Sequence, residues 1–212
     1  MNRPNMLIPL MLMAASWAIA AWYWPHLPAT MPVHWGLHGE PNGWMPMPWG
    51  ALVGPLVTTF MAAVFALVSR RATSAEVGGV MAALGAAFGC FLTVLTLDTA
   101  SRPDQHLDVR LLWGGMGLLF VVLGNYMPKL RRNPYMGIRT PWTMGNEEVW
   151  YRTHRVAGRI MVATGLVVTA ASQLPPLPGT VVVIAALVAM GVGTSAYSYW
   201  LHRQLTNGGG PA

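Results

Sequence analysis

The chain has 212 residues, of which 54% are apolar and only 9% are charged, whereas an average soluble domain carries roughly 25% charged residues. So few charges cannot cover a water-exposed surface, which excludes a soluble globular protein, and the high hydrophobicity excludes an intrinsically disordered chain. The single cysteine, Cys90, excludes an internal disulfide framework and a metal site with several cysteine ligands. The net charge of +6 suits either nucleic acid or a membrane surface, and the positions of the charges decide between them.

Long apolar runs predict about six membrane-spanning helices, since one crossing needs about 20 apolar residues. Five runs contain no Asp, Glu, Lys or Arg: residues 6–24, 49–69, 77–97, 111–127 and 180–201. The weakest candidate is 160–174, which has to recruit Ala157 and Gly158 and to let Arg159 snorkel to the interface. The predicted fold class is therefore all-α, a polytopic transmembrane helical bundle.

The basic residues predict the orientation of this bundle. With six spans and the N-terminus inside, eleven of the thirteen Lys and Arg residues lie in cytoplasmic segments, and only Arg102 and Arg110 lie outside. This asymmetry follows the positive-inside rule, so we expect N-in/C-in topology in a bacterial cytoplasmic (inner) membrane. The lipid bilayer is then the partner of the basic charges, and no direct nucleic acid binding is expected.

The first apolar run has an alternative interpretation as a cleaved signal peptide. Arg3, the short run and Ala18-Ile19-Ala20 imitate the parts of such a peptide, including an A-x-A cleavage site. We favour an uncleaved span, because the apolar run continues to Trp24 and because five remaining spans would fit the charge pattern less well.

Small residues predict where the helices pack, since lipid provides little hydrophobic drive for helix association. They gather on three spans, at Gly85 and Gly89, at Gly114, Gly115 and Gly117, and at Gly191, Gly193 and Ala196. We expect these faces to pack within one bundle rather than to form a dimer contact.

The outer loop 25–47 carries His34, His38 and Glu40. Its prolines and glycines prevent a helix, so we expect an ordered, turn-rich loop. Histidines four residues apart bind zinc when they lie on a helix, but Gly36 and Gly39 break that geometry. We therefore expect no metal, and histidines that hydrogen-bond within the loop or face the interface, with pH sensing as the alternative.

A second outer segment, 98–110, holds Asp98, Asp104 and Asp108. The simpler interpretation is that these acids solvate the helix ends. The functional alternative is a mildly acidic landing site for cationic peptides, which electrostatic steering would attract.

The cytoplasmic segment 124–159 is the most informative. Asn125 lies inside the fourth span and needs a polar partner, and Pro128 ends or kinks that helix. Asn133-Pro134 and Pro141 enforce extended or turned chain. The segment therefore contains an irregular loop at the membrane surface.

A helix should restart near Asn146, with Glu147 and Glu148 in its first turn, where the helix dipole favours acidic groups. Glu148 and Arg152 have the spacing of an ion pair, and Trp150 and His154 share one face. We expect a short interfacial helix that leads into the fifth span.

The run GNYMPKLRRNPYMGIRTPWTMGNEEVWYRTHRVAGR closely resembles the SdpI family of bacterial membrane proteins. The outer loop LPATMPVHWGLHGEPNGW is similar to the segment that often precedes the SdpI region. The resemblance implies a cytoplasmic binding motif that consists of Asn125, Pro128, Arg139, Thr140, Pro141, Trp142, Glu147, Glu148, Trp150 and His154. It departs from the family at Met144-Gly145-Asn146, and Asn146 can still cap the helix.

The resemblance also implies two units and a function. The units are 1–75, with two spans and the outer loop, and 76–212, an SdpI-like four-span region with the motif loop 125–159. The implied function is immunity against a secreted, membrane-active peptide toxin. The family's namesake is also thought to signal by holding an autorepressor at the membrane, so the implied partners are an antimicrobial peptide outside and a repressor inside.

Three interpretations of the cytoplasmic segment stay open: a basic loop on anionic lipid, a protein-docking surface anchored by Arg and Trp, and an enzyme site using Glu147, Glu148 and His154. No nucleophile motif, phosphate loop or metal set accompanies these residues, so we expect no enzyme and no cofactor. The alternative functions are a small-solute transporter or channel and, as the weakest, a membrane metal-dependent enzyme. The near absence of ionisable residues at mid-depth counts against proton-coupled transport.

Overall fold

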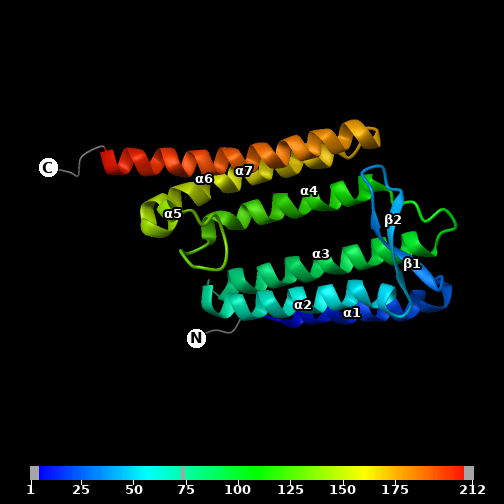
Figure 1. The fold of residues 1–212 in the computed structure, drawn as a ribbon. Helices are drawn as coiled ribbons and strands as arrows, with labels where there is room; N and C mark the ends of the chain where they lie inside the picture. The colour runs from blue at the N-terminus through cyan, green and yellow to red at the C-terminus, as the bar shows by residue number, and fades with distance from the viewer. Residues whose placement is uncertain (1–4, 73–74, 208–212) are drawn as a thin grey trace.

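The structure is a computed structural model that describes residues 5–72 and 75–207, and it consists mainly of long helices lying side by side (Figure 1). The long helices are α1 (Leu7–Tyr23), α2 (Trp49–Ala72), α3 (Ala75–Ser101), α4 (Val109–Tyr126), α6 (Glu147–Ala171) and α7 (Pro176–Asn207). Short elements connect them: η1 (Trp24–His26), β1 (Thr30–Trp35), β2 (Pro41–Pro46), η2 (Met127–Lys129) and α5 (Pro141–Gly145). The predicted helical bundle is confirmed.

Within the described ranges, five helices are long and apolar enough to cross a membrane: Leu7–His26, Trp49–Val68, Val77–Ser101, Val109–Lys129 and Pro176–Asn207. Helix α6, which contains the weakest predicted span, is not among them because its first half is rich in charge. It nevertheless has 25 residues, about 37 Å at 1.5 Å per residue, and lies between α4 and α7 (Figure 1). A bundle with about six spans is consistent with this arrangement, and the N-in/C-in orientation stays a prediction.

Helices α1, α2 and α3 pack together on one side of the molecule (Figure 1). Small residues allow α2 and α3 to approach closely. A Cβ at Gly89 would lie 2.8 Å from Oγ1 of Thr58, and one at Gly54 would lie 2.7 Å from Oγ1 of Thr93. Gly85 lies against the ring of Phe65, so the packing face predicted for Gly85 and Gly89 is confirmed.

Helices α4, α6 and α7 form the other side (Figure 1). Two glycine pairs bring α4 and the antiparallel α6 into backbone contact. A Cβ at Gly124 would lie 2.7 Å from the carbonyl oxygen of Gly158, and one at Gly165 would lie 2.6 Å from that of Gly117. Glycine is therefore required at this crossing, because any side chain would force the two helices apart.

The packing face predicted for Gly191 and Gly193 is wrong. A Cβ at either residue would meet no atom within 4 Å. Helix α7 instead packs on α6 through Val183, which is buried against Val168 and Ala171, and Thr194 and Ser198 are also buried. Glycines show where another helix can approach closely, but they do not show that a helix lies there.

The loop 25–47, predicted to lie outside, folds into an antiparallel two-stranded sheet, β1–β2, which lies across one end of α1–α3 (Figure 1). Met31 anchors it and is fully buried in a cluster with Ala20, Ala51 and Leu97. Gly39, with φ +93°, takes a backbone conformation that glycine tolerates, and its carbonyl accepts a hydrogen bond from Leu107 N–H at 2.9 Å. The loop is ordered, as predicted, but the sheet was not expected.

Candidate functional site

Residues 127–154 form a compact structure at the end of the bundle opposite the sheet, which we call the motif module. Its first turn is organised by Asn133, which is buried. The Oδ1 atom accepts hydrogen bonds from the N–H groups of Tyr135 and Met136 at 2.9 and 2.8 Å, and Nδ2 donates to the Arg131 carbonyl at 2.7 Å. The turn predicted from Asn133-Pro134 is confirmed. The Asn133 side chain bonds backbone N–H groups that have no partner in a helix or sheet here.

Trp150 and His154 form the centre of the motif module. Their rings stack with centroids 4.0 Å apart, and both residues are at most 2% exposed. Trp150 Nε1–H donates to the Leu130 carbonyl at 2.8 Å. Both side chains therefore hold the loop against α6 and are not open to a ligand.

The hydrogen bonds of His154 define its protonation. The N–H of Ile138 donates to Nε2 at 3.0 Å, so Nε2 carries no hydrogen, and Nδ1–H donates to the Trp150 carbonyl at 2.8 Å. Burial lowers the pKa of His154, against a smaller opposing effect of the bond to Trp150. The neutral imidazole is thus the form that the motif module binds.

Gly137 makes the approach of Ile138 to His154 possible. It has φ +104°, in the left-handed region that strains other residues. A Cβ at this position would overlap Nε2 of His154 and would lie 3.2 Å from the ring of Trp150.

Helix α5 begins at a capping box. Thr140 N–H donates to Oγ1 of Thr143 at 2.9 Å, and Thr143 N–H donates to Oγ1 of Thr140 at 3.3 Å. Pro141 follows the cap at the first helical position, where a missing N–H costs nothing. Thr143 is fully buried and also donates to the Ile138 carbonyl at 2.7 Å.

Trp142 connects α5 to α7. Its Nε1–H donates to Oγ of Ser198 at 2.6 Å. The ring meets Tyr199 edge-on at 5.2 Å and stacks on His202 at 6.3 Å between centroids. This residue therefore links the motif loop to the last helix of the bundle.

The helix predicted to restart near Asn146 does so, because Oδ1 of Asn146 accepts hydrogen bonds from Glu148 N–H and Val149 N–H at 2.9 and 3.2 Å. The predicted ion pair is present, with Arg152 Nε 2.5 Å from Oε1 of Glu148. The expected short interfacial helix is not a separate element, however. Residues from Glu147 to Ala171 form one continuous helix.

Four further residues of the predicted motif are exposed, namely Asn125, Arg139, Glu147 and Glu148, and Pro128 is half-buried beside Gly158. Arg139 donates to the Pro134 carbonyl at 2.6 Å, and Asn125 finds its predicted partner in the Val121 carbonyl at 2.7 Å. Glu147 and Glu148 point to solvent, whereas His154 is buried against Ile138. The two glutamates and this histidine therefore do not form one acid–base site.

The outer residues lie at the opposite end of the molecule. His34 Nδ1 lies 2.5 Å from Oδ1 of Asn42 on the neighbouring strand, so this histidine hydrogen-bonds within the loop, as predicted. His38 and Glu40 are exposed, and the Glu40 carboxylate lies beside Gly36. Across residues 5–72 and 75–207, no three His, Cys, Asp or Glu side chains gather as metal ligands.

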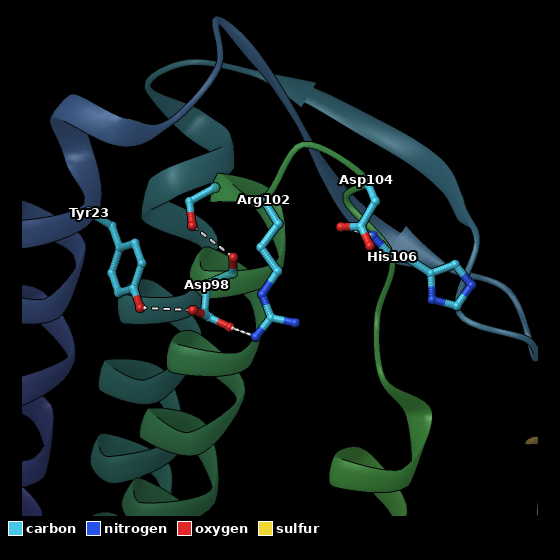
Figure 2. A network of polar contacts seen from close by, with 6 residues as sticks. Tyr23, Asp98, Arg102, Asp104 and His106 are labelled. Carbon is cyan, nitrogen blue, oxygen red and sulfur yellow. Dashed lines mark hydrogen bonds and ion pairs between the residues drawn. The ribbon is translucent and has the colours of Figure 1, made fainter.

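The three acids of the segment 98–110 take part in local structure, and Figure 2 shows two of them, Asp98 and Asp104. Asp98 pairs with Arg102 and accepts a hydrogen bond from Tyr23 O–H at 3.3 Å, which ties α1 to α3. Asp104 receives a long bond from His106 N–H, at 3.5 Å. Asp108 caps α4 by accepting from Arg110 N–H at 3.0 Å. The predicted loop 98–110 is shorter than expected, because α3 continues to Ser101.

Comparison with known proteins gives two family matches. Residues 129–198 match the SdpI/YfhL protein family, and residues 11–59 match a domain of unknown function, DUF1648. The chain is also similar to the immunity protein SdpI of Bacillus subtilis (strain 168), with 23% identity over 202 residues that cover 94% of this chain and 96% of that protein. No solved structure matches. The first match contains most of the motif module and ends at Ser198, the partner of Trp142.

Proposed function

Because the chain belongs to the SdpI/YfhL family of multi-pass bacterial inner-membrane proteins, we propose that it protects its cell against a secreted, membrane-active peptide. The observation that carries this proposal is the similarity to an immunity protein along 94% of the chain. Similarity of that extent includes both the outer sheet and the motif module, so the proposal concerns the whole architecture and not one motif.

The outer end supplies the surface for the peptide. Trp44 on β2 and Leu37 in the turn between the strands are more than half exposed, and His38 and Glu40 in the same turn are also exposed. Exposed aromatic and aliphatic groups beside an acidic one suit an amphipathic cationic peptide, because such a peptide presents the complementary apolar and basic faces. The sheet is held in place by buried Met31 and is therefore a preformed platform.

In this proposal the motif module is the cytoplasmic region that changes when the peptide binds outside. Its core includes Met127, Leu130 and Trp150 and also Val77 and Met81 of α3. Both sides of the bundle thus meet in one cluster. Peptide binding outside would shift the helices against this cluster and alter the exposed surface around Arg139, where a repressor would be held.

The alternative of a solute transporter or channel has less support. Thr58 and Thr93 are buried between α2 and α3, but each hydroxyl donates to a carbonyl of its own helix at 2.9 Å. Thr58 donates to the Gly54 carbonyl, and Thr93 donates to the Gly89 carbonyl. These hydroxyls stabilise helix packing and do not line an open path.

The test is survival and membrane potential of a sensitive bacterium that expresses the full chain, challenged with a panel of membrane-active peptides. We expect selective protection against one peptide class, and loss of that protection in Trp44→Ala and Leu37→Ser proteins that still insert. No protection by the wild-type chain across the panel, with insertion confirmed, would contradict the proposal.

A second arm separates immunity from signalling. Arg139→Ala should insert and protect normally but lose recruitment of a repressor, whereas Arg131→Ala, a matched exposed arginine in the same loop, should retain both. If Arg139→Ala loses protection as well, the exposed motif surface acts in immunity itself and the two roles are not separable.

A further inference from the structure

A groove lies between the inner end of α4 and helix α6, outside the core of the motif module. Its volume is about 470 Å³, and Asn125 and Pro128 form one wall while residues of α6 form the other. This volume falls within the range of small-molecule sites, roughly 300–1,000 Å³. The groove exists because the Gly124–Gly158 contact draws the helix backbones together and leaves the flanking side chains spread apart.

The α6 wall changes from cationic to apolar along its length. Arg155 and Arg159 lie one turn apart at the inner end, and Val162, Ala163 and Leu166 continue along the helix toward the middle of the bundle. Leu166 is 58% exposed, so the apolar part of the groove is open to the bilayer. Arg159 directly precedes the predicted span 160–174 and therefore lies at the expected membrane boundary.

The two arginines of the groove lack acidic partners in the part of the chain that the structure describes. The ion pairs found there are Arg102–Asp98 and Arg152–Glu148. Arg155 lies over the ring of Tyr151 at 5.5 Å, which leaves its guanidinium N–H groups available. Arg152, one turn before Arg155, is neutralised by Glu148. The unpaired positive charge on this part of α6 is therefore concentrated at Arg155 and Arg159.

We propose that this groove binds an anionic phospholipid of the adjacent leaflet, which is the cytoplasmic one in the predicted topology. The headgroup phosphate lies between the guanidinium groups of Arg155 and Arg159, and one acyl chain follows Val162 and Leu166. Charge complementarity selects an anionic headgroup, because basic pockets between membrane helices bind such lipids and guanidinium groups match phosphate oxygens. The order of cationic and apolar wall matches the order of headgroup and acyl chain.

The test uses the full-length protein purified in neutral detergent and exposed to phosphatidylcholine alone or to an equal mixture of phosphatidylcholine and phosphatidylglycerol. Native mass spectrometry measures which lipid stays bound. We expect retained phosphatidylglycerol on the wild-type chain and about thirtyfold weaker retention after Arg155→Gln with Arg159→Gln. The matched control, Arg131→Gln with Arg203→Gln, removes the same charge from exposed residues elsewhere and should retain the lipid.

Two further arms separate a lipid from free phosphate. Ala163→Phe keeps both arginines but fills the apolar wall, and it should lower phosphatidylglycerol retention. Inorganic phosphate at equal concentration should not displace the lipid. Equal loss of lipid in the control pair, no effect of Ala163→Phe, or full displacement by inorganic phosphate would each overturn the proposal.

Discussion

At the end of the bundle predicted to face outward, the β1–β2 sheet leaves His38, Glu40 and Trp44 exposed, whereas at the opposite end the motif module buries Trp150 and His154. Both regions are rich in residue types that carry chemistry. In the first, these side chains are available to a partner. In the second, they hold the loop to the helices. Residue type therefore indicates a possible site, and burial decides whether its side chains can bind a partner or stabilise the fold.

The strongest way to sharpen this comparison is a pair of tryptophan substitutions. Trp150→Ala should lower the free energy of unfolding by about 3–5 kcal/mol, because it removes a buried aromatic ring and leaves a cavity. Trp44→Ala, on the exposed face of the sheet, should change it by less than about 0.5 kcal/mol. Thermal unfolding in neutral detergent measures both. Equal destabilisation would show that the two ends do not differ in this way.

A pair of glycine substitutions tests the backbone of the motif module. Gly137→Ala should cost about 1–3 kcal/mol, because it strains a left-handed residue and crowds His154. Gly145→Ala serves as the control, since a Cβ there meets no atom within 4 Å. The same unfolding measurement applies. A Gly137→Ala protein as stable as the control would mean that the loop conformation can relax.

The pH dependence of stability tests the neutral form of His154. The unfolded side chain titrates near pH 6.5, and burial lowers the pKa in the folded protein. Below about pH 6.5 the unfolded state binds more protons, so this contribution to stability is complete above that pH and decreases as the pH falls toward the folded pKa. His154→Gln should remove this part of the pH profile, and His38→Gln should retain it. An unchanged profile in His154→Gln would assign the dependence to another group.

The smallest expected effect concerns exposed ion pairs at the two ends. Glu148→Gln should cost about 0.3–0.5 kcal/mol, because its pair with Arg152 lies in solvent. Asp98→Asn should cost more, since Asp98 also accepts the hydrogen bond of Tyr23. Added salt should reduce the first effect. A larger cost for Glu148→Gln than for Asp98→Asn would contradict the role of Tyr23.

Local signals in the sequence predicted the features that depend on neighbouring residues. Apolar length predicted the spans, Asn146 predicted a helix start, and spacing by four predicted both the Glu148–Arg152 pair and the Trp150–His154 stack. Each of these interactions joins residues within one helical turn, so periodicity is enough to find them.

Features that join distant residues were not predicted. The Ile138 N–H that donates to His154 lies sixteen residues away, and no sequence period encodes a backbone donor. The prolines of the outer loop concealed β1 and β2, because proline usually argues against a strand. Tyr23 and Asp98 were assigned to a helix end and to a loop, and only the packing of α1 on α3 brings them together.

The glycine contacts between α4 and α6 also have a consequence for the time order of synthesis. Chains are made from the N-terminus at roughly 5–20 residues per second, and α3 follows α2 almost immediately, so these two helices can pair as soon as they enter the membrane. Gly117 waits longest of these glycines, because residues 118–164 must be translated before its partner Gly165 exists. Until then the glycine face of α4 lacks the α6 backbone against which it packs in the finished bundle.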